Sequence, residues 1–148
     1  NVLYVDGQRN ALLEERVGAR RVELRELLPV ADVLTLHVPL TSASRHLIGA
    51  QQLAAMKPTG ILINTARGPI VDETALVAAL RNGRIAGAGF DVYEHEPRLT
   101  PGLDELPNVV LLPHLGSAAT ATRQRMSQMV ADNVLAVLEG REPPNPVN

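Results

Sequence analysis

The sequence predicts an α/β protein built on a parallel sheet, and three features support that class. Short apolar runs alternate along the chain with segments of helical character, the order typical of parallel strands joined by crossover helices. The run at residues 61–63 is apolar throughout, as in a strand buried on both faces. Polar side chains follow several of these runs directly, at the edge where open α/β sheets bind ligands.

Composition narrows the possible functions. The chain has 148 residues, of which 45% are hydrophobic and 20% charged, as in an ordinary globular domain. A net charge of −2 and only three aromatic residues give no case for binding nucleic acid or an anionic membrane. Cysteine is absent, and no stretch has the length of a membrane span. We therefore expect no nucleic-acid partner, no membrane and no metal site.

Strand and helix signals follow each other in order. Gly18 and Pro29 each end a short expected helix, Asp72 is a good N-cap, and Asn82-Gly83 is a good helix stop. The chain opens on Asn1 and enters a strand at once, so we expect that a preceding region is missing. The expected strands are 2–5, 33–38, 61–63, 85–92 and 109–112, and the expected helices are 11–17, 24–28, 50–56, 72–81 and about 118–139.

Arg67 is the first candidate site residue, because it follows the strand at 61–63 and precedes the break at Gly68-Pro69. Its planar guanidinium suits a carboxylate or a phosphate, although an Arg in this place can equally pair with a surface acid. Asp6 follows the first apolar run. It either accepts hydrogen bonds from the ribose hydroxyls of a dinucleotide or simply forms an Asp-Gly turn with Gly7.

Four polar residues are expected along one edge of the sheet: Arg67, Asp91, Glu96 and His114. His114 can take or give a proton near neutral pH, and Glu96 could accept a hydrogen bond from its other ring nitrogen. Arg67 could hold a substrate carboxylate and polarise the neighbouring carbonyl group. This set contains no nucleophile and suits proton transfer coupled to hydride transfer.

The Gly87-Ala88-Gly89 segment does not predict a phosphate-binding loop. Val92 occupies the last position of the glycine fingerprint, and the segment reads as a strand followed by an acid where a helix would be required. The small residues here are expected to permit the close approach of a backbone or ligand.

Four stretches, taken in order, carry a family resemblance. They are HVPLT at 37–41, NTARGPIV at 64–71, GAGFDVYE at 87–94 with Glu96-Pro97, and PHLGS at 113–117. Together they resemble the NAD-dependent D-isomer-specific 2-hydroxyacid dehydrogenases, closest to the glyoxylate/hydroxypyruvate reductase and phosphoglycerate dehydrogenase branches. The resemblance covers essentially the whole chain.

The resemblance implies a role for each matching position. Arg67 matches the arginine that binds the substrate carboxylate, His114 the proton donor and acceptor, and Glu96 the glutamate paired with that histidine, whereas Glu94 lacks the family spacing. Asp6 matches the acid on the ribose and favours NAD over NADP, a preference that Arg9 softens. The other cofactor-binding positions implied, beside Arg67 and His114 themselves, are Val38, Pro39, Thr65, Ala66, Asp91, Gly116 and Ser117.

The same resemblance implies an incomplete, doubly wound Rossmann-like sheet without its first strand and glycine-rich turn. Residues 1–117 would form the partial NAD-binding domain, and 118–148 a helix and tail returning toward an absent substrate domain. The implied enzyme is a cytoplasmic homodimer acting on a small 2-oxo or 2-hydroxy acid, with this chain inactive alone. The alternatives are an NAD-sensing corepressor-like binding module, an inert truncated fragment, or a phosphite or formate dehydrogenase.

Overall fold

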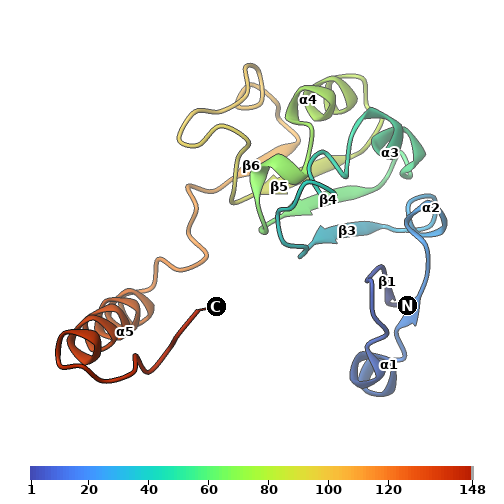
Figure 1. Cartoon of the computed structure of the whole chain (residues 1–148). Coiled ribbons are helices and arrows are strands. Elements are labelled where there is room, and N and C mark those ends of the chain that lie inside the picture. The colour runs from blue at the N-terminus through green and yellow to red at the C-terminus, as the bar shows by residue number, and fades with distance from the viewer. Residues whose placement is uncertain (148) are drawn as a thin grey trace. The chain divides into compact units, whose positions relative to one another are not determined.

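The computed structural model describes residues 1–147, which divide into two units, residues 1–113 and residues 114–147. The first unit holds all the strands and most of the helices (Figure 1). In chain order the elements are β1 (Leu3–Tyr4), α1 (Ala11–Val17), β2 (Arg20–Arg21), α2 (Leu24–Leu27), β3 (Val33–Leu36), α3 (Ala50–Ala55), β4 (Ile61–Asn64), η1 (Gly68–Ile70), α4 (Glu73–Arg81), β5 (Gly87–Phe90), β6 (Val109–Leu111) and α5 (Thr120–Leu138).

All strand pairs are parallel, which confirms the predicted class. One sheet has the order β3-β4-β5-β6, and a second, two-stranded sheet pairs β1 with β2. The β2 strand was not predicted, because its two residues, Arg20 and Arg21, carry no apolar signal. Strands β3, β5 and β6 are shorter than the expected strands 33–38, 85–92 and 109–112, whereas β4 extends one residue beyond the expected 61–63, to Asn64.

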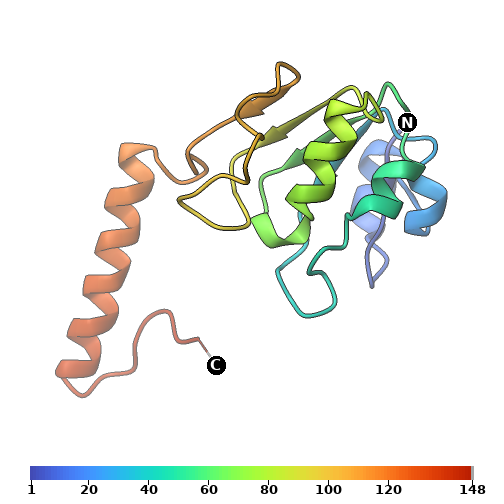
Figure 2. The ribbon, with the colours of Figure 1, turned by 90° about the horizontal axis from the view of Figure 1, so that it is seen from above.

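Helices α3 and α4 lie side by side over one face of the four-stranded sheet (Figures 1 and 2). Leu62 in β4 and Leu76 in α4 have no exposed surface, and both belong to the hydrophobic core. On the opposite face Ile61 is 39% exposed and Val110 is 64% exposed. The expectation that the strand at 61–63 is buried on both faces is therefore wrong, since helices α3 and α4 cover only the face of Leu62.

Helix ends follow the local signals in the sequence. Asn10 caps α1 by accepting the Leu13 amide at 3.0 Å, and Gly18 ends it in the left-handed conformation with φ 64°. Asp72 caps α4 by accepting the Ala75 amide at 2.9 Å, as predicted. Both predicted helix starts are confirmed by these bonds, and α4 thereby begins directly after the turn that carries Arg67.

The second unit contains α5, which confirms the predicted long C-terminal helix. Ala136 is its only buried residue among those described, and Val130, Val134 and Val137 are all more than half exposed. Among the described residues, none of the helices combines the length and the apolar character that a membrane crossing requires.

Candidate active site

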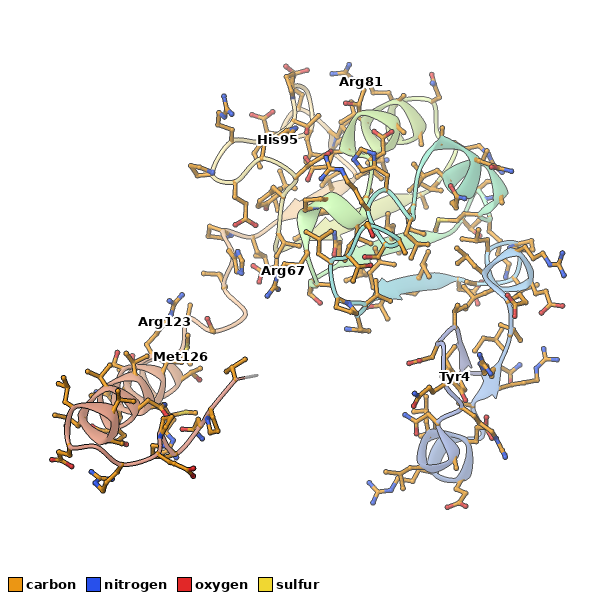
Figure 3. All side chains as sticks on the ribbon, viewed as in Figure 1. Tyr4, Arg67, Arg81, His95, Arg123 and Met126 are labelled. Carbon is orange, nitrogen blue, oxygen red and sulfur yellow. The ribbon has the colours of Figure 1, made fainter. Side chains whose placement is uncertain are left out.

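The turn after β4 is shaped by Asn64, the last residue of that strand. Its side chain is fully buried; Nδ2 donates to the Arg67 carbonyl oxygen at 3.0 Å, and Oδ1 accepts the Ala66 amide at 3.1 Å. These two bonds fold Thr65 and Ala66 over the strand end and leave Arg67 exposed at the end of the sheet (Figure 3). The sequence analysis did not single out Asn64, although a side-chain amide at the end of an apolar strand could have indicated a residue that shapes the following turn.

Arg67 lies on the turn with its guanidinium close to its own backbone. Its Nη1 donates to the Ala66 carbonyl oxygen at 2.6 Å, and no ion pair to Arg67 is among the salt bridges of the described residues. An exposed guanidinium held by one backbone carbonyl keeps most of its donors available to an anionic ligand. This geometry favours a ligand-binding role over the alternative of pairing with a surface acid.

Gly68, the next residue, brings this turn against the loop that follows β5. A Cβ atom at Gly68 would be 1.9 Å from the carbonyl carbon and oxygen of Tyr93 and 2.4 Å from the Glu94 nitrogen, a separation that no side chain tolerates. The backbones of the Arg67 turn and of the loop carrying Glu96 are therefore in direct contact. Asp91, at the start of that loop, is buried and donates its backbone N–H to the Asn64 carbonyl oxygen at 3.1 Å.

The loop after β5 folds around two glutamates. Glu96 accepts the Tyr93 amide through Oε1 at 3.0 Å. The Glu94 carboxylate, 9% exposed, accepts from His46 Nε2 at 2.7 Å and from Arg45 Nη2 at 3.2 Å. Glu94 is thus committed to side chains of the segment after β3. This favours Glu96, over Glu94, as the carboxylate that the family pattern pairs with His114.

Tyr93 anchors the start of the loop to the end of β6. Its hydroxyl donates to the Leu112 carbonyl oxygen at 2.6 Å, and its side chain is buried. Burial raises the pKa of Tyr93 above its usual range, and the charge of Asp91 raises this pKa further. The neutral phenol is therefore the form that the folded protein holds.

This pKa shift predicts a loss of stability in alkali. The folded-state pKa of Tyr93 lies above the unfolded one, so its contribution is fully present below about pH 10 and is lost as the pH rises through the folded pKa. In Tyr93→Phe the alkaline loss should shrink, while the missing hydrogen bond should cost about 1 kcal/mol at pH 7. Thermal unfolding followed from neutral to alkaline pH measures both, with Tyr4→Phe as control; an equally steep alkaline loss in Tyr93→Phe contradicts this assignment.

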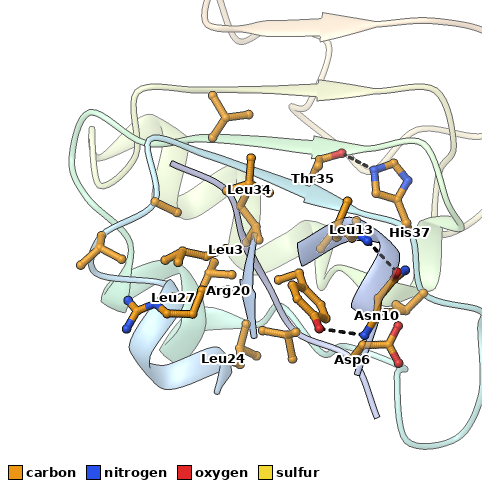
Figure 4. A pocket seen from close by; sticks show the side chains of 18 of the residues that line it. Leu3, Asp6, Asn10, Leu13, Arg20, Leu24, Leu27, Leu34, Thr35 and His37 are labelled. Carbon is orange, nitrogen blue, oxygen red and sulfur yellow. Dashed lines mark hydrogen bonds between the residues drawn. The ribbon is translucent and has the colours of Figure 1, made fainter. Parts of the chain in front are cut away.

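A cleft of about 1500 Å³ separates β1 from β3 (Figure 4). Three of the predicted cofactor residues line it: Asp6 after β1, and Val38 and Pro39 after β3. Its apolar wall includes Leu3 and Leu34, and Asp6 is exposed at its edge. Two carboxylates line the cleft: Asp32, which pairs with Lys57 at 2.8 Å, and Asp6, which is the kind of acceptor that the ribose hydroxyls of a dinucleotide require.

The turn after β1 is held by residues that the sequence analysis passed over. Arg21 in β2 donates from Nε to the Asp6 carbonyl oxygen at 2.9 Å and from Nη2 to the Gly7 carbonyl oxygen at 3.1 Å. The Asp6 carboxylate accepts the Gln8 amide at 2.9 Å. These bonds fix the backbone of the turn, so the Asp6 carboxylate is held at the edge of the cleft.

Arg9, which softened the expected preference for NAD, is held by Glu14. Its Nε donates to Glu14 Oε2 at 2.7 Å, and Tyr4 donates its hydroxyl to Glu14 Oε1 at 2.8 Å. The hydrogen bond from Arg9, followed by that from Tyr4, lowers the pKa of Glu14, and the pKa of Arg9 is raised in turn. Exposed pairs of this kind are weak, so Glu14 restrains Arg9 without removing it as a possible phosphate partner.

His114, Gly116 and Ser117 lie in the second unit. His114 follows Pro113 directly and adopts a left-handed backbone with φ 56°, a conformation unusual for a residue other than glycine. A turn follows, in which the Ala118 amide donates to the Leu115 carbonyl oxygen at 2.9 Å. Their expected roles with Arg67 and Glu96 remain predictions. Within the described residues no group of His, Asp and Glu side chains is arranged to hold a metal ion.

The parallel sheet, with polar turns after β1 and β4, defines a nucleotide-binding α/β protein of the Rossmann type. The chain belongs to the family of D-isomer specific 2-hydroxyacid dehydrogenases: the model of their NAD binding domain matches residues 1–116. The family assignment made from the four sequence stretches is thereby confirmed, and so is a nicotinamide cofactor as the ligand class of the domain.

Named relatives agree with this assignment. The chain is 48% identical over 147 residues to the glyoxylate reductase of Thermococcus litoralis, which covers 99% of this chain and 44% of that protein. A crystal structure of the TT0316 protein from Thermus thermophilus matches with a TM-score of 0.89 at 49% identity, covering 99% of this chain and 46% of that one.

A third relative comes from Sinorhizobium meliloti. The structure of its NADPH-dependent glyoxylate/hydroxypyruvate reductase, in complex with NADP and malonate, matches with a TM-score of 0.87 at 41% identity over 98% of this chain and 44% of that one. The chain thus spans less than half the length of the relatives it matches.

Proposed function

We propose that this chain is the cofactor-binding and catalytic portion of a reductase that interconverts a 2-oxo acid, such as glyoxylate or hydroxypyruvate, and its D-2-hydroxy acid. The observation that carries the proposal is the contact between Gly68 and Tyr93, which joins the Arg67 turn to the loop of Glu96. The named reductases among its relatives support the substrate class. The proposal concerns the chain as part of a longer polypeptide like those relatives.

Each residue has a distinct task in this proposal. Arg67 binds the carboxylate of the 2-oxo acid through its planar fork and places the neighbouring carbonyl carbon. His114 gives a proton to the carbonyl oxygen during reduction and takes it back during oxidation. Glu96 accepts a hydrogen bond from the imidazole and thereby orients the ring. The nicotinamide cofactor, when bound, supplies the hydride.

The cofactor would be held at two places. Asp6, Val38 and Pro39 would receive the adenosine part, with the Asp6 carboxylate accepting hydrogen bonds from the ribose hydroxyls. Thr65, Ala66 and Asp91 would face the nicotinamide part beside the Arg67 turn. Gly116 and Ser117 belong to the proposed cofactor site through the family resemblance. Asp6 favours NAD because its carboxylate repels a 2′-phosphate.

Activity is tested in a fusion enzyme, made by joining the part of the Thermococcus litoralis glyoxylate reductase that precedes the matched region to this chain. We expect the fusion enzyme to oxidise NADH when glyoxylate or hydroxypyruvate is added, and the 148-residue chain alone to show no such activity. A folded fusion enzyme that binds NADH yet reduces neither acid would overturn the proposed function. Turnover by the chain alone would contradict its expected inactivity.

Cofactor preference follows from Asp6. Asp6→Ala in the fusion enzyme should weaken NAD binding about tenfold, because ribose hydrogen bonds to a charged acceptor are lost, and should improve binding of NADP relative to NAD. Calorimetric titration of both cofactors measures the ratio of their Kd values. Asp104→Ala, in an exposed loop position, removes the same charge and should leave the ratio unchanged. An Asp6→Ala variant with an unaltered ratio would remove Asp6 from the ribose site.

Two further expectations, a homodimer and a location in the cytoplasm, belong to the proposal through the family resemblance. The first is checked by sedimentation of the fusion enzyme, in which a monomer at micromolar concentration would contradict it.

A further inference from the structure

Glu73 is a buried carboxylate to which the proposed mechanism gives no task. It is the first residue of α4 and has no exposed surface. Oε1 accepts the Glu94 backbone N–H at 2.7 Å, and Oε2 accepts the Thr100 hydroxyl at 2.6 Å. Burying a charged carboxylate is costly, and here the helix N-terminus and these two hydrogen bonds offset that cost. Because burying this carboxylate is costly, we expect Glu73 to have a specific role in addition to packing.

Capping α4 does not supply that reason. Asp72 already caps the helix through its bond to the Ala75 amide. The Glu73 carboxylate is directed to the loop after β5, which lies 21 residues further along the chain at Glu94 and 27 at Thr100. Its two bonds therefore join the start of α4, next to the Arg67 turn, to that loop.

The two partners of Glu73 bracket Glu96. Glu94 is fixed twice: its backbone N–H by Glu73, and its carboxylate by His46 and Arg45. Thr100 holds the far side of the same segment. Since Glu96 is exposed and lies two residues after Glu94, its position depends on how firmly the backbone on either side is held. The buried Glu73 carboxylate bonds to both sides.

We propose that Glu73 is a positioning residue for Glu96: its carboxylate clamps residues 94–100 against the start of α4 and so fixes Glu96 relative to Arg67. The inference rests on the proposed function, in which Glu96 orients the proton-transferring histidine. Loss of the clamp should lower kcat, because Glu96 then spends less time in place. The KM for glyoxylate should change little, because Arg67 and its turn are held separately by Asn64.

The clamp itself is tested on this chain by hydrogen exchange at single amides. In Glu73→Ala the Glu94 amide should exchange at least about tenfold faster than in the parent chain, since its acceptor is lost. Thr100→Val removes one of the two bonds and should leave the Glu94 amide protected. Asp72→Ala loosens the start of α4 without touching the clamp, and it too should leave that amide protected. Unchanged exchange at Glu94 in Glu73→Ala overturns the proposal.

The catalytic consequence is tested in the fusion enzyme. Glu73→Ala should lower kcat about 10- to 100-fold with the KM for glyoxylate within about threefold, as expected for loss of an oriented proton-transfer group. Glu73→Gln should restore most of kcat, because its amide oxygen can accept the Glu94 N–H and its amide nitrogen can donate to the Thr100 hydroxyl. Asp72→Ala should stay within about twofold of the parent kcat, since α4 loses only a cap.

Two outcomes contradict the positioning role. One is a Glu73→Gln variant as impaired as Glu73→Ala. The other is an Asp72→Ala variant with the same melting temperature as Glu73→Ala and the same loss of kcat, because stability alone would then explain the loss. An inactive parent fusion enzyme would overturn the proposed function instead, while the exchange of the Glu94 amide would still decide whether the clamp exists.

Discussion

Replacing Gly68 with alanine is expected to destabilise the chain by about 3 kcal/mol or more, the largest stability effect that the structure predicts. The added Cβ would lie 1.9 Å from the Tyr93 carbonyl carbon and oxygen, and the obstacle is backbone, which no side-chain rotation can relieve. Either the Arg67 turn or the loop after β5 must move. For a domain of this size the melting temperature should fall by about 6–12 °C.

The matched control is Gly7→Ala. Nothing lies within 4 Å of a Cβ built on Gly7, and its backbone is not left-handed, so the change should stay within about 0.5 kcal/mol. Thermal unfolding of the three proteins by calorimetry makes the comparison. Gly68→Ala with the stability of Gly7→Ala would contradict the backbone contact on which the candidate site is built.

Replacing Arg67 with alanine should abolish most catalysis in the fusion enzyme. Charge-assisted, forked hydrogen bonds to a carboxylate of this kind are worth about 1.5–3 kcal/mol each, so their loss should lower kcat/KM about 10³-fold. KM should rise and kcat should fall together, because Arg67 both binds the carboxylate and places the carbonyl. Binding of NADH should persist, which shows that the variant is assembled.

Two further variants delimit the role of Arg67. Arg67→Lys keeps the charge without the planar fork and should recover only part of kcat/KM. Arg81→Ala removes an equal charge from α4, where Arg81 pairs with exposed Glu105 at 3.1 Å, and should stay within about twofold of the parent. An unchanged kcat/KM in Arg67→Ala would contradict the role of Arg67 in binding the substrate carboxylate.

The parallel α/β class and most helix boundaries could be predicted because the signals are local. Gly18 and Asp72 act through bonds within a few residues of themselves, and the structure forms those bonds. The two-residue strand β2 gave no such signal. The sequence also contains no local signal that Ile61 would be exposed, because its exposure depends on which face of the sheet α3 and α4 cover.

The residues of the candidate site also fall into two groups, those that the sequence predicts and those that it does not. Arg67 and Asp91 were singled out because each lies at the end of an expected strand or just beyond it, and Glu96 because of its spacing to Asp91. Glu73 and the need for glycine at position 68 were missed because each acts through a contact with a segment distant in the chain. Asn64 acts locally, on Ala66 and Arg67, and its signal was passed over. Sequence patterns point to polar residues at strand ends more readily than to the residues that hold the surrounding turns and loops in place.

The most direct test of the central claim is transfer of deuterium from NADH that carries deuterium at both positions on C4 of the nicotinamide. The fusion enzyme is given the labelled cofactor and glyoxylate, and the mass of the glycolate formed is measured by mass spectrometry. Our account predicts glycolate carrying the deuterium on C2, and its near-complete loss in Arg67→Ala and His114→Ala. Unlabelled glycolate, or labelled product at the parent rate in both variants, would contradict hydride transfer at the site described.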